Sequence, residues 1–145
     1  MSGRILGFDY GIKRIGIAVG NQKTNSSQCL SSVSAKNGEP FWEQIDALIQ
    51  EWKPATLIVG LPLKMDGTHG DAANAATRFA DALGTRYNIP VTLVDERLSS
   101  NEADVLIRQS APSGRSLTRK RQKMRDSVAA ELIIKTYLND NPAPI

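Results

Sequence analysis

Apolar residues alternate with small or polar ones in the first part of the chain, as a half-buried β-strand requires. Two such runs, Arg4–Asp9 and Arg14–Gly20, are joined by four residues that include Gly11, which suits a tight turn. They predict a β-hairpin. A weaker run at Gln28–Ser34 follows a polar stretch and predicts a third strand. Three strands with short connections imply an antiparallel meander.

The apolar period then changes to that of a helix, because Phe41, Ile45, Leu48 and Trp52 share one helical face. The predicted helix spans Pro40–Trp52, with proline at its start. The β-branched run at Thr56–Gly60, which follows this helix, is typical of a fully buried strand. The further predicted elements are a strand at Thr56–Gly60, a loop at Leu61–Gly70, a helix over Ala72–Tyr87, a strand at Val91–Asp95, a helix from Ser99 or Ser100 to Arg108, a loop at Ser110–Gln122 and a last helix from near Met124.

This order predicts an α/β fold with one five-stranded mixed sheet and helices on both faces. The chain has 145 residues, of which 41% are hydrophobic and 23% charged, as expected for one globular domain. We expect that domain to span 1–138, with a flexible tail at 139–145. No apolar run has the length of a signal-peptide core or a membrane span, and together with the single cysteine this predicts a cytoplasmic protein.

The net charge of +3 conceals one strongly basic segment. The other 12 basic residues are outnumbered by the 15 acidic ones, so the rest of the chain carries −3. Such a concentration of charge predicts a polyanionic partner, although a solvated basic loop would look the same. Aromatic residues do not interleave with the segment, which favours contacts to a nucleic-acid backbone over base stacking. The segment's basic residues are Arg115, Arg119, Lys120, Arg121, Lys123 and Arg125.

Three carboxylates stand where predicted apolar elements begin or end. Asp9 closes the first strand on the face of Ile5 and Gly7, Glu96 follows the last strand, and Asp126 begins the last helix on its inward face. Each alone has an ordinary explanation: a turn former, a surface ion pair, and a favourable charge at a helix N-terminus.

Together the three acids predict a metal site at one edge of the sheet. Like charges gathered there raise one another's pKa unless a cation lies between them. Since the chain has one cysteine, Cys29, and one histidine, His69, the ligands must be mainly carboxylate oxygens, which favours Mg²⁺ or Mn²⁺. Because strand residues alternate in direction, only one of Asp95 and Glu96 is expected to meet Asp9. Carboxylate-held Mg²⁺ is a standard means of cleaving phosphodiesters.

Four blocks of this sequence resemble the YqgF (RuvX) family, in family order and over most of the chain. They are Phe8-Asp9-Tyr10-Gly11-Ile12-Lys13-Arg14-Ile15-Gly16-Ile17-Ala18, Ile58-Val59-Gly60-Leu61-Pro62 with Asp66-Gly67, Asp95-Glu96-Arg97-Leu98-Ser99, and Asp126-Ser127-Val128-Ala129-Ala130. Any one block is weak, whereas their combination is specific. Residues 21–55 carry no diagnostic match.

The resemblance implies an RNase H-like fold with strand order 3-2-1-4-5 and an acidic metal-binding set of Asp9, Glu96 and Asp126. It implies a nuclease linked to maturation of the small-subunit ribosomal RNA precursor, or a Holliday-junction resolvase, and leaves RNA versus DNA open. We expect phosphate contacts from Lys13, Arg14 and Arg97 and from the basic segment. The run from Thr118 to Arg125 is richer in arginine than the family pattern, which bears on affinity rather than chemistry.

Two other function classes remain open from the sequence. Asp-x-Gly at Asp9–Gly11 also resembles the phosphate loop of phosphotransferases of the actin–hexokinase type, although those need two such domains and 145 residues supply one. Alternatively, the protein binds nucleic acid without catalysis, in which case the basic segment matters and the acids do not. Asp9→Asn separates catalysis from binding, because it removes a charge and keeps the shape.

Overall fold

The computed structural model describes the backbone of residues 3–96 and 119–141, and the side chains of 3–96 and 127–141. The predicted helix between Ser99 and Arg108 lies outside these residues. In the described part, no helix is long and apolar enough to cross a membrane. The elements, in chain order, are β1 (Arg4–Asp9), β2 (Arg14–Asn21), β3 (Ser26–Lys36), β4 (Glu39–Pro40), α1 (Trp42–Trp52), β5 (Thr56–Leu61), α2 (Asp71–Tyr87), β6 (Val91–Asp95) and α4 (Arg119–Asp140).

The strands form one mixed sheet in the order β4-β3-β2-β1-β5-β6. β1, β2 and β3 are antiparallel neighbours, whereas β5 and β6 run parallel to β1. The predicted order 3-2-1-4-5 is therefore confirmed, and the two-residue strand β4 adds a sixth member. β4 exists because Pro40 pairs with Ala35 at the sheet edge, where a residue without an N–H is tolerated. As a result α1 begins at Trp42 and not at the predicted Pro40.

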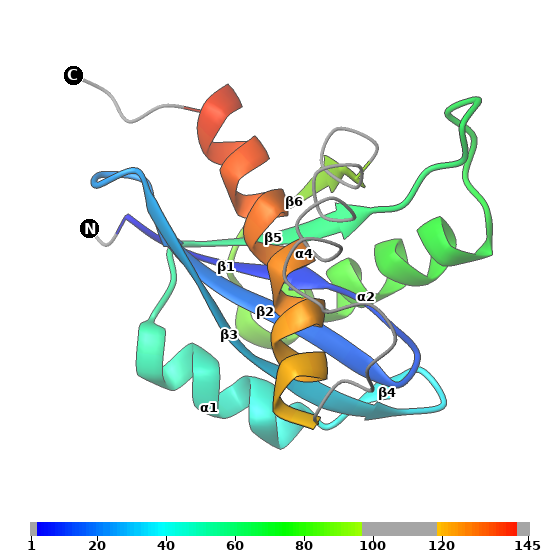
Figure 1. Cartoon of the computed structure of the whole chain (residues 1–145), viewed down its shortest axis with the longest axis horizontal. Helices are drawn as coiled ribbons and strands as arrows, with labels where there is room; N and C mark the ends of the chain where they lie inside the picture. Colours follow the sequence, from blue (N-terminus) through cyan, green and yellow to red (C-terminus); the bar gives the residue numbers. More distant parts are fainter. Residues whose placement is uncertain (1–2, 97–118, 142–145) are drawn as a thin grey trace.

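Two hydrophobic cores lie on opposite faces of the sheet, and the alternation along β1 separates them. Leu6 and Phe8 face α1 and α2, together with Phe79 of α2. Ile5 faces α4, together with Ile134 of that helix. Figure 1 shows α4 lying across one face of the sheet and α1 and α2 on the other. The predicted placement of helices on both faces is confirmed.

The last helix is longer than predicted at both ends. It begins at Arg119, so four residues assigned to the preceding loop, 119–122, are helical. The loop prediction was wrong there because it gave weight to the clustered charge, whereas Arg, Lys and Gln are good helix formers. At the other end the helix continues through Asp140, two residues past the predicted boundary at 138, and the amide of Asn141 still donates to the carbonyl of Tyr137 at 2.9 Å.

Candidate functional site

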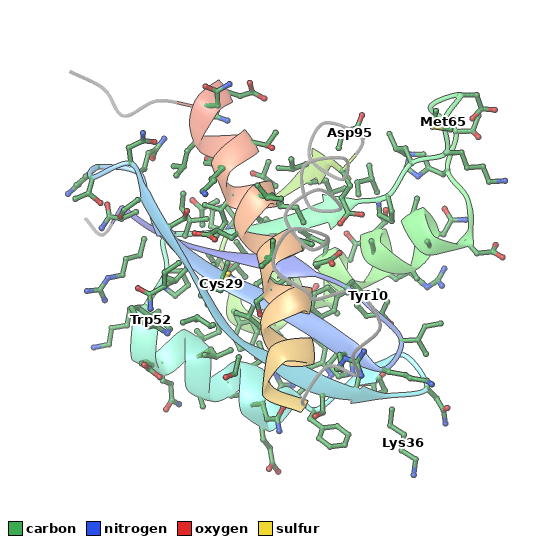
Figure 2. The ribbon with its side chains drawn as sticks, viewed as in Figure 1. Tyr10, Cys29, Lys36, Trp52, Met65 and Asp95 are labelled. Carbon is green, nitrogen blue, oxygen red and sulfur yellow. The ribbon has the colours of Figure 1, made fainter. Side chains whose placement is uncertain are left out.

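The carboxyl ends of β1, β5 and β6 share one edge of the sheet, because these strands are parallel neighbours. Asp9 is the last residue of β1, and Glu96 follows the last residue of β6. Residues after the carboxyl ends of parallel strands are well placed to form a site in such sheets. Figure 2 labels Tyr10 and Asp95, which adjoin these two acids in the chain.

Gly60 of β5 leaves the space that Glu96 occupies. A Cβ atom at this glycine would lie 2.6 Å from Glu96 Oε1 and 2.5 Å from Ile133 Cδ1 of α4. Both distances are shorter than real Cβ contacts, so a side chain at this position would push the carboxyl group or the helix away. Gly60 therefore allows Glu96 to fold back over β5. The sequence signal for this role was a glycine at the end of a β-branched run, and it was not recognised as part of the site.

The Glu96 carboxyl group hydrogen-bonds the side chain of Asp9, and its pKa is raised to about 9. Burial is the largest cause, the hydrogen bond and negative charge of Asp9 come next, and the charge of Asp95 adds to them. A carboxyl group in this setting holds a proton at neutral pH, which the hydrogen bond shares with its neighbour. Of the two acids at the end of β6, Glu96 is thus the one that meets Asp9, and Asp95 acts through its charge.

Asp126 belongs to α4, which packs on the sheet face of Ile5 and Gly7, the same face that strand alternation gives to Asp9. The helix lies close to the sheet at two glycines. A Cβ atom added at Gly7 or at Gly20 would lie 2.6 Å from the side chain of Ile134. Asp126 lies seven residues after Arg119, the first residue of α4. It is therefore not in the first turn, as the sequence suggested, and a charge at the helix N-terminus no longer accounts for it. Its side chain is outside the described part, so its role as a ligand stays a prediction.

Among the side chains described, no group of three His, Cys, Asp or Glu residues is assembled into a metal site. Asp9 and Glu96 are two of the three predicted ligands. The third predicted ligand is Asp126.

The predicted phosphate-binding residues lie in three parts of the chain. Lys13 is exposed in the turn between β1 and β2, and Arg14 is partly buried at the start of β2. Both residues therefore follow Asp9 within the β1–β2 hairpin. Arg97 and Arg115 lie outside the described residues. The remaining five basic residues belong to the first two turns of α4, before Asp126, and their side chains are not described: Arg119, Lys120, Arg121, Lys123 and Arg125.

Four other residues of types that often serve in functional sites lie as follows. Trp42 and Trp52 pack against the core on the side of α1 and α2. His69 is exposed in the loop between β5 and α2. Cys29 is partly buried beneath α4 and donates to Glu131 at 3.3 Å, while burial and the charge of Glu131 raise the pKa of its thiol to about 12.

The family model that matches residues 3–140 is described as RuvX, Holliday junction resolvase. The chain belongs to the RuvX family. The matched range, residues 3–140, spans all four sequence blocks that resemble this family.

Similar curated proteins support the same family. One from Pseudomonas fluorescens (strain SBW25), named "Putative pre-16S rRNA nuclease", is 45% identical over 139 residues. The alignment covers 96% of this chain and 94% of that protein. Another of the same name, from Saccharophagus degradans, is 40% identical over 138 residues, with coverage of 95% and 94%.

Solved structures with the same fold have little sequence in common with this chain. T. thermophilus RuvC in complex with Holliday junction substrate has a TM-score of 0.54 at 14% identity and covers 98% of this RuvX chain and 99% of its own. Fowlpox virus resolvase with substrate Holliday junction DNA has a TM-score of 0.57 at 13% identity, with coverage of 94% and 97%. These likenesses confirm the RuvC-like, RNase H-type fold.

Proposed function

We propose that this RuvX protein is a metal-dependent endonuclease that hydrolyses phosphodiester bonds in nucleic acid. The observation that carries the proposal is the partly buried, hydrogen-bonded carboxyl pair of Asp9 and Glu96 at the carboxyl edge of the parallel strands. The relatives are named as pre-16S rRNA nucleases and the family as a Holliday junction resolvase, which favours this function over the phosphotransferase alternative.

The donor set fits a hard divalent cation. Two hydrogen-bonded carboxyl groups in a partly buried site form a place where a cation is favourable, because it allows both groups to ionise. The oxygen donors suit Mg²⁺ or Mn²⁺. Asp9, Glu96 and Asp126 would hold the ion, which when bound supplies charge neutralisation at a phosphate and activation of water.

The basic residues would hold the nucleic-acid backbone beside these acids. Lys13 and Arg14 follow Asp9 within five residues, and Arg97 follows Glu96 directly. The basic segment ends at Arg125, immediately before Asp126. Cations next to the acids in the chain provide phosphate contacts without reading sequence, so they would place the backbone rather than select a base.

The substrate we favour is the precursor of 16S ribosomal RNA at its 5′ end, in the cytoplasm. The support is the shared name of relatives that match nearly the whole chain at 40–45% identity. The second candidate is a four-way DNA junction, which the family description and the junction complexes of the same fold support. Resolution of a junction requires two symmetric active sites, so a strictly monomeric protein would count against it.

The test compares cleavage of a precursor 16S rRNA with cleavage of a four-way DNA junction, in Mg²⁺ and in EDTA. Wild-type protein should cut one of the two substrates in Mg²⁺ and neither of them in EDTA. Asp9→Asn should abolish cutting while nucleic-acid binding is kept or strengthened, because it removes a negative charge beside the phosphate. The matched control is Asp81→Asn, at an exposed aspartate of α2. Binding without cleavage by the wild-type protein on either substrate would instead support the non-catalytic alternative.

A further inference from the structure

Ser127 is a fully buried polar residue at the junction of three elements. Its exposed fraction is 0%, although it adjoins the proposed metal ligand Asp126. Its hydroxyl group accepts a hydrogen bond from the backbone N–H of Ile17 in β2, with an N–Oγ distance of 3.3 Å, and donates to the backbone carbonyl of Leu30 in β3. One side chain thus ties α4 to two strands of the sheet.

The hydroxyl binds where the pairing of β2 with β3 is irregular. Ile15 pairs with Val33 and Ile17 pairs with Leu30, so one residue of β2 lies opposite two residues of β3. This arrangement is a β-bulge, which disrupts the ladder of backbone hydrogen bonds locally. A hydroxyl group is both donor and acceptor, so that of Ser127 can contact both the N–H of Ile17 and the carbonyl of Leu30, which are register partners beside the bulge.

The bulge is adjacent to the carboxyl pair. Asp9 of β1 is the register partner of Gly16, and Gly16 immediately precedes Ile17. On the helix, Asp126 immediately precedes Ser127. The hydrogen bond between Ile17 and Ser127 therefore joins two residues close to the proposed ligands. Ile17 follows Gly16, the partner of Asp9, and Ser127 follows Asp126.

The geometry points to Ser127 as a positioning residue that sets where Asp126 stands relative to Asp9 and Glu96. This inference rests on the proposed function, because it assumes that the three acids hold one divalent ion. The close contacts of Ile134 with Gly7 and Gly20 hold α4 against the sheet eight residues further along, roughly 12 Å from Asp126. Such packing contacts have little directional preference, whereas the two hydrogen bonds fix the helix at the site itself.

Substitution of Ser127 allows positioning to be separated from stability. Ser127→Ala leaves two buried backbone groups without this partner and is expected to lower the melting temperature. Leu138→Ala on the same helix removes a buried side chain, of which 5% is exposed, eleven residues or roughly 16 Å from Ser127. It serves as the control, because it destabilises the same interface far from the site.

The experiment measures the Mg²⁺ concentration for half-maximal cleavage, and separately the Mg²⁺ affinity by calorimetry. Ser127→Ala should raise both at least fivefold and lower kcat, with KM for nucleic acid within twofold of wild type. Leu138→Ala should leave both Mg²⁺ values within twofold, at a similar loss of melting temperature. Wild-type Mg²⁺ values in Ser127→Ala, or an equal rise in Leu138→Ala, would overturn the inference.

Two further arms keep the outcome decisive. If Ser127→Ala does not fold, Ser127→Cys, which retains the shape with a weaker donor, should raise the Mg²⁺ values in the same direction. If the wild-type protein binds Mg²⁺ but cuts neither substrate, the proposed function fails, and the calorimetric comparison still decides the role of Ser127. Absence of Mg²⁺ binding by the wild-type protein would overturn both.

Discussion

Replacement of Glu96 by glutamine should stabilise the metal-free protein. In the folded state the Glu96 carboxyl group has a pKa of about 9, against an ordinary value of 4.5. Between these values the unfolded chain ionises this group while the folded protein keeps it protonated, so the unfolded state binds fewer protons. Stability therefore falls as pH rises from about 4.5 to about 9. Glu96→Gln removes this penalty, and its amide N–H can still donate to Asp9.

The magnitude follows from the shift. At pH 7 the unfolded chain is about 2.5 pH units above the pKa of its Glu96 carboxyl group, whereas the folded protein is still below the pKa of that group. Each pH unit in this interval changes the free energy of unfolding by about 1.4 kcal/mol. The variant should thus exceed the wild type in free energy of unfolding by up to about 3 kcal/mol at pH 7 and by nothing below pH 4. For a domain of this size that difference corresponds to roughly 6–12 °C in melting temperature.

The assay is thermal unfolding of both proteins in EDTA from pH 4 to pH 9, followed by addition of Mg²⁺. The gap between the melting curves should widen with pH, and Mg²⁺ should stabilise the wild type much more than the variant, by about 2.7 kcal/mol at a hundred times the dissociation constant. Glu51→Gln, at an exposed site in α1, serves as the control and should show no gap. Equal melting temperatures for Glu96→Gln and wild type at pH 4 and pH 8 would refute the assignment of a buried, protonated carboxyl group.

Three further outcomes are expected. Gly60→Ala should cost about 1–3 kcal/mol of stability and reduce cleavage, because its Cβ would meet both Glu96 and Ile133; urea unfolding and a cleavage assay measure these, and wild-type values for both would contradict the packing argument. Gly7→Ala should destabilise similarly through contact with Ile134 while affecting Mg²⁺ affinity less than Gly60→Ala does, which calorimetry can establish. Cys29 should react with a thiol reagent at pH 8 about a hundred to a thousand times more slowly than a free cysteine, since its pKa is about 12; rapid modification of the folded protein would be inconsistent with this.

The strands and helices themselves were predictable from the sequence, because each depends on a pattern within a single element. The strand order 3-2-1-4-5 was implied only by the family resemblance, and the structure confirms it. The alternation in Arg4–Asp9 and the helical period in Ala72–Tyr87 come from the need to bury one side of a strand or helix. Boundaries were less predictable, as β4 and the early start of α4 show. Pro40 pairs with a strand elsewhere in the chain, and the helix of the basic segment reflects residue propensity that clustered charge obscured.

The candidate acids were identifiable only as a set, because each has an ordinary explanation alone and a metal site explains all three together. By itself the sequence determined the fold class through periodicity, and it limited any metal ligands mainly to carboxylates, because the chain has one cysteine and one histidine. Only the tertiary structure decided that Glu96 rather than Asp95 meets Asp9, that Gly60 makes room for it, and that Ser127 ties α4 to the bulge beside Gly16. These depend on distances between strands and a helix remote in sequence, and burial in the packed chain, rather than residue type, fixes the proton on Glu96.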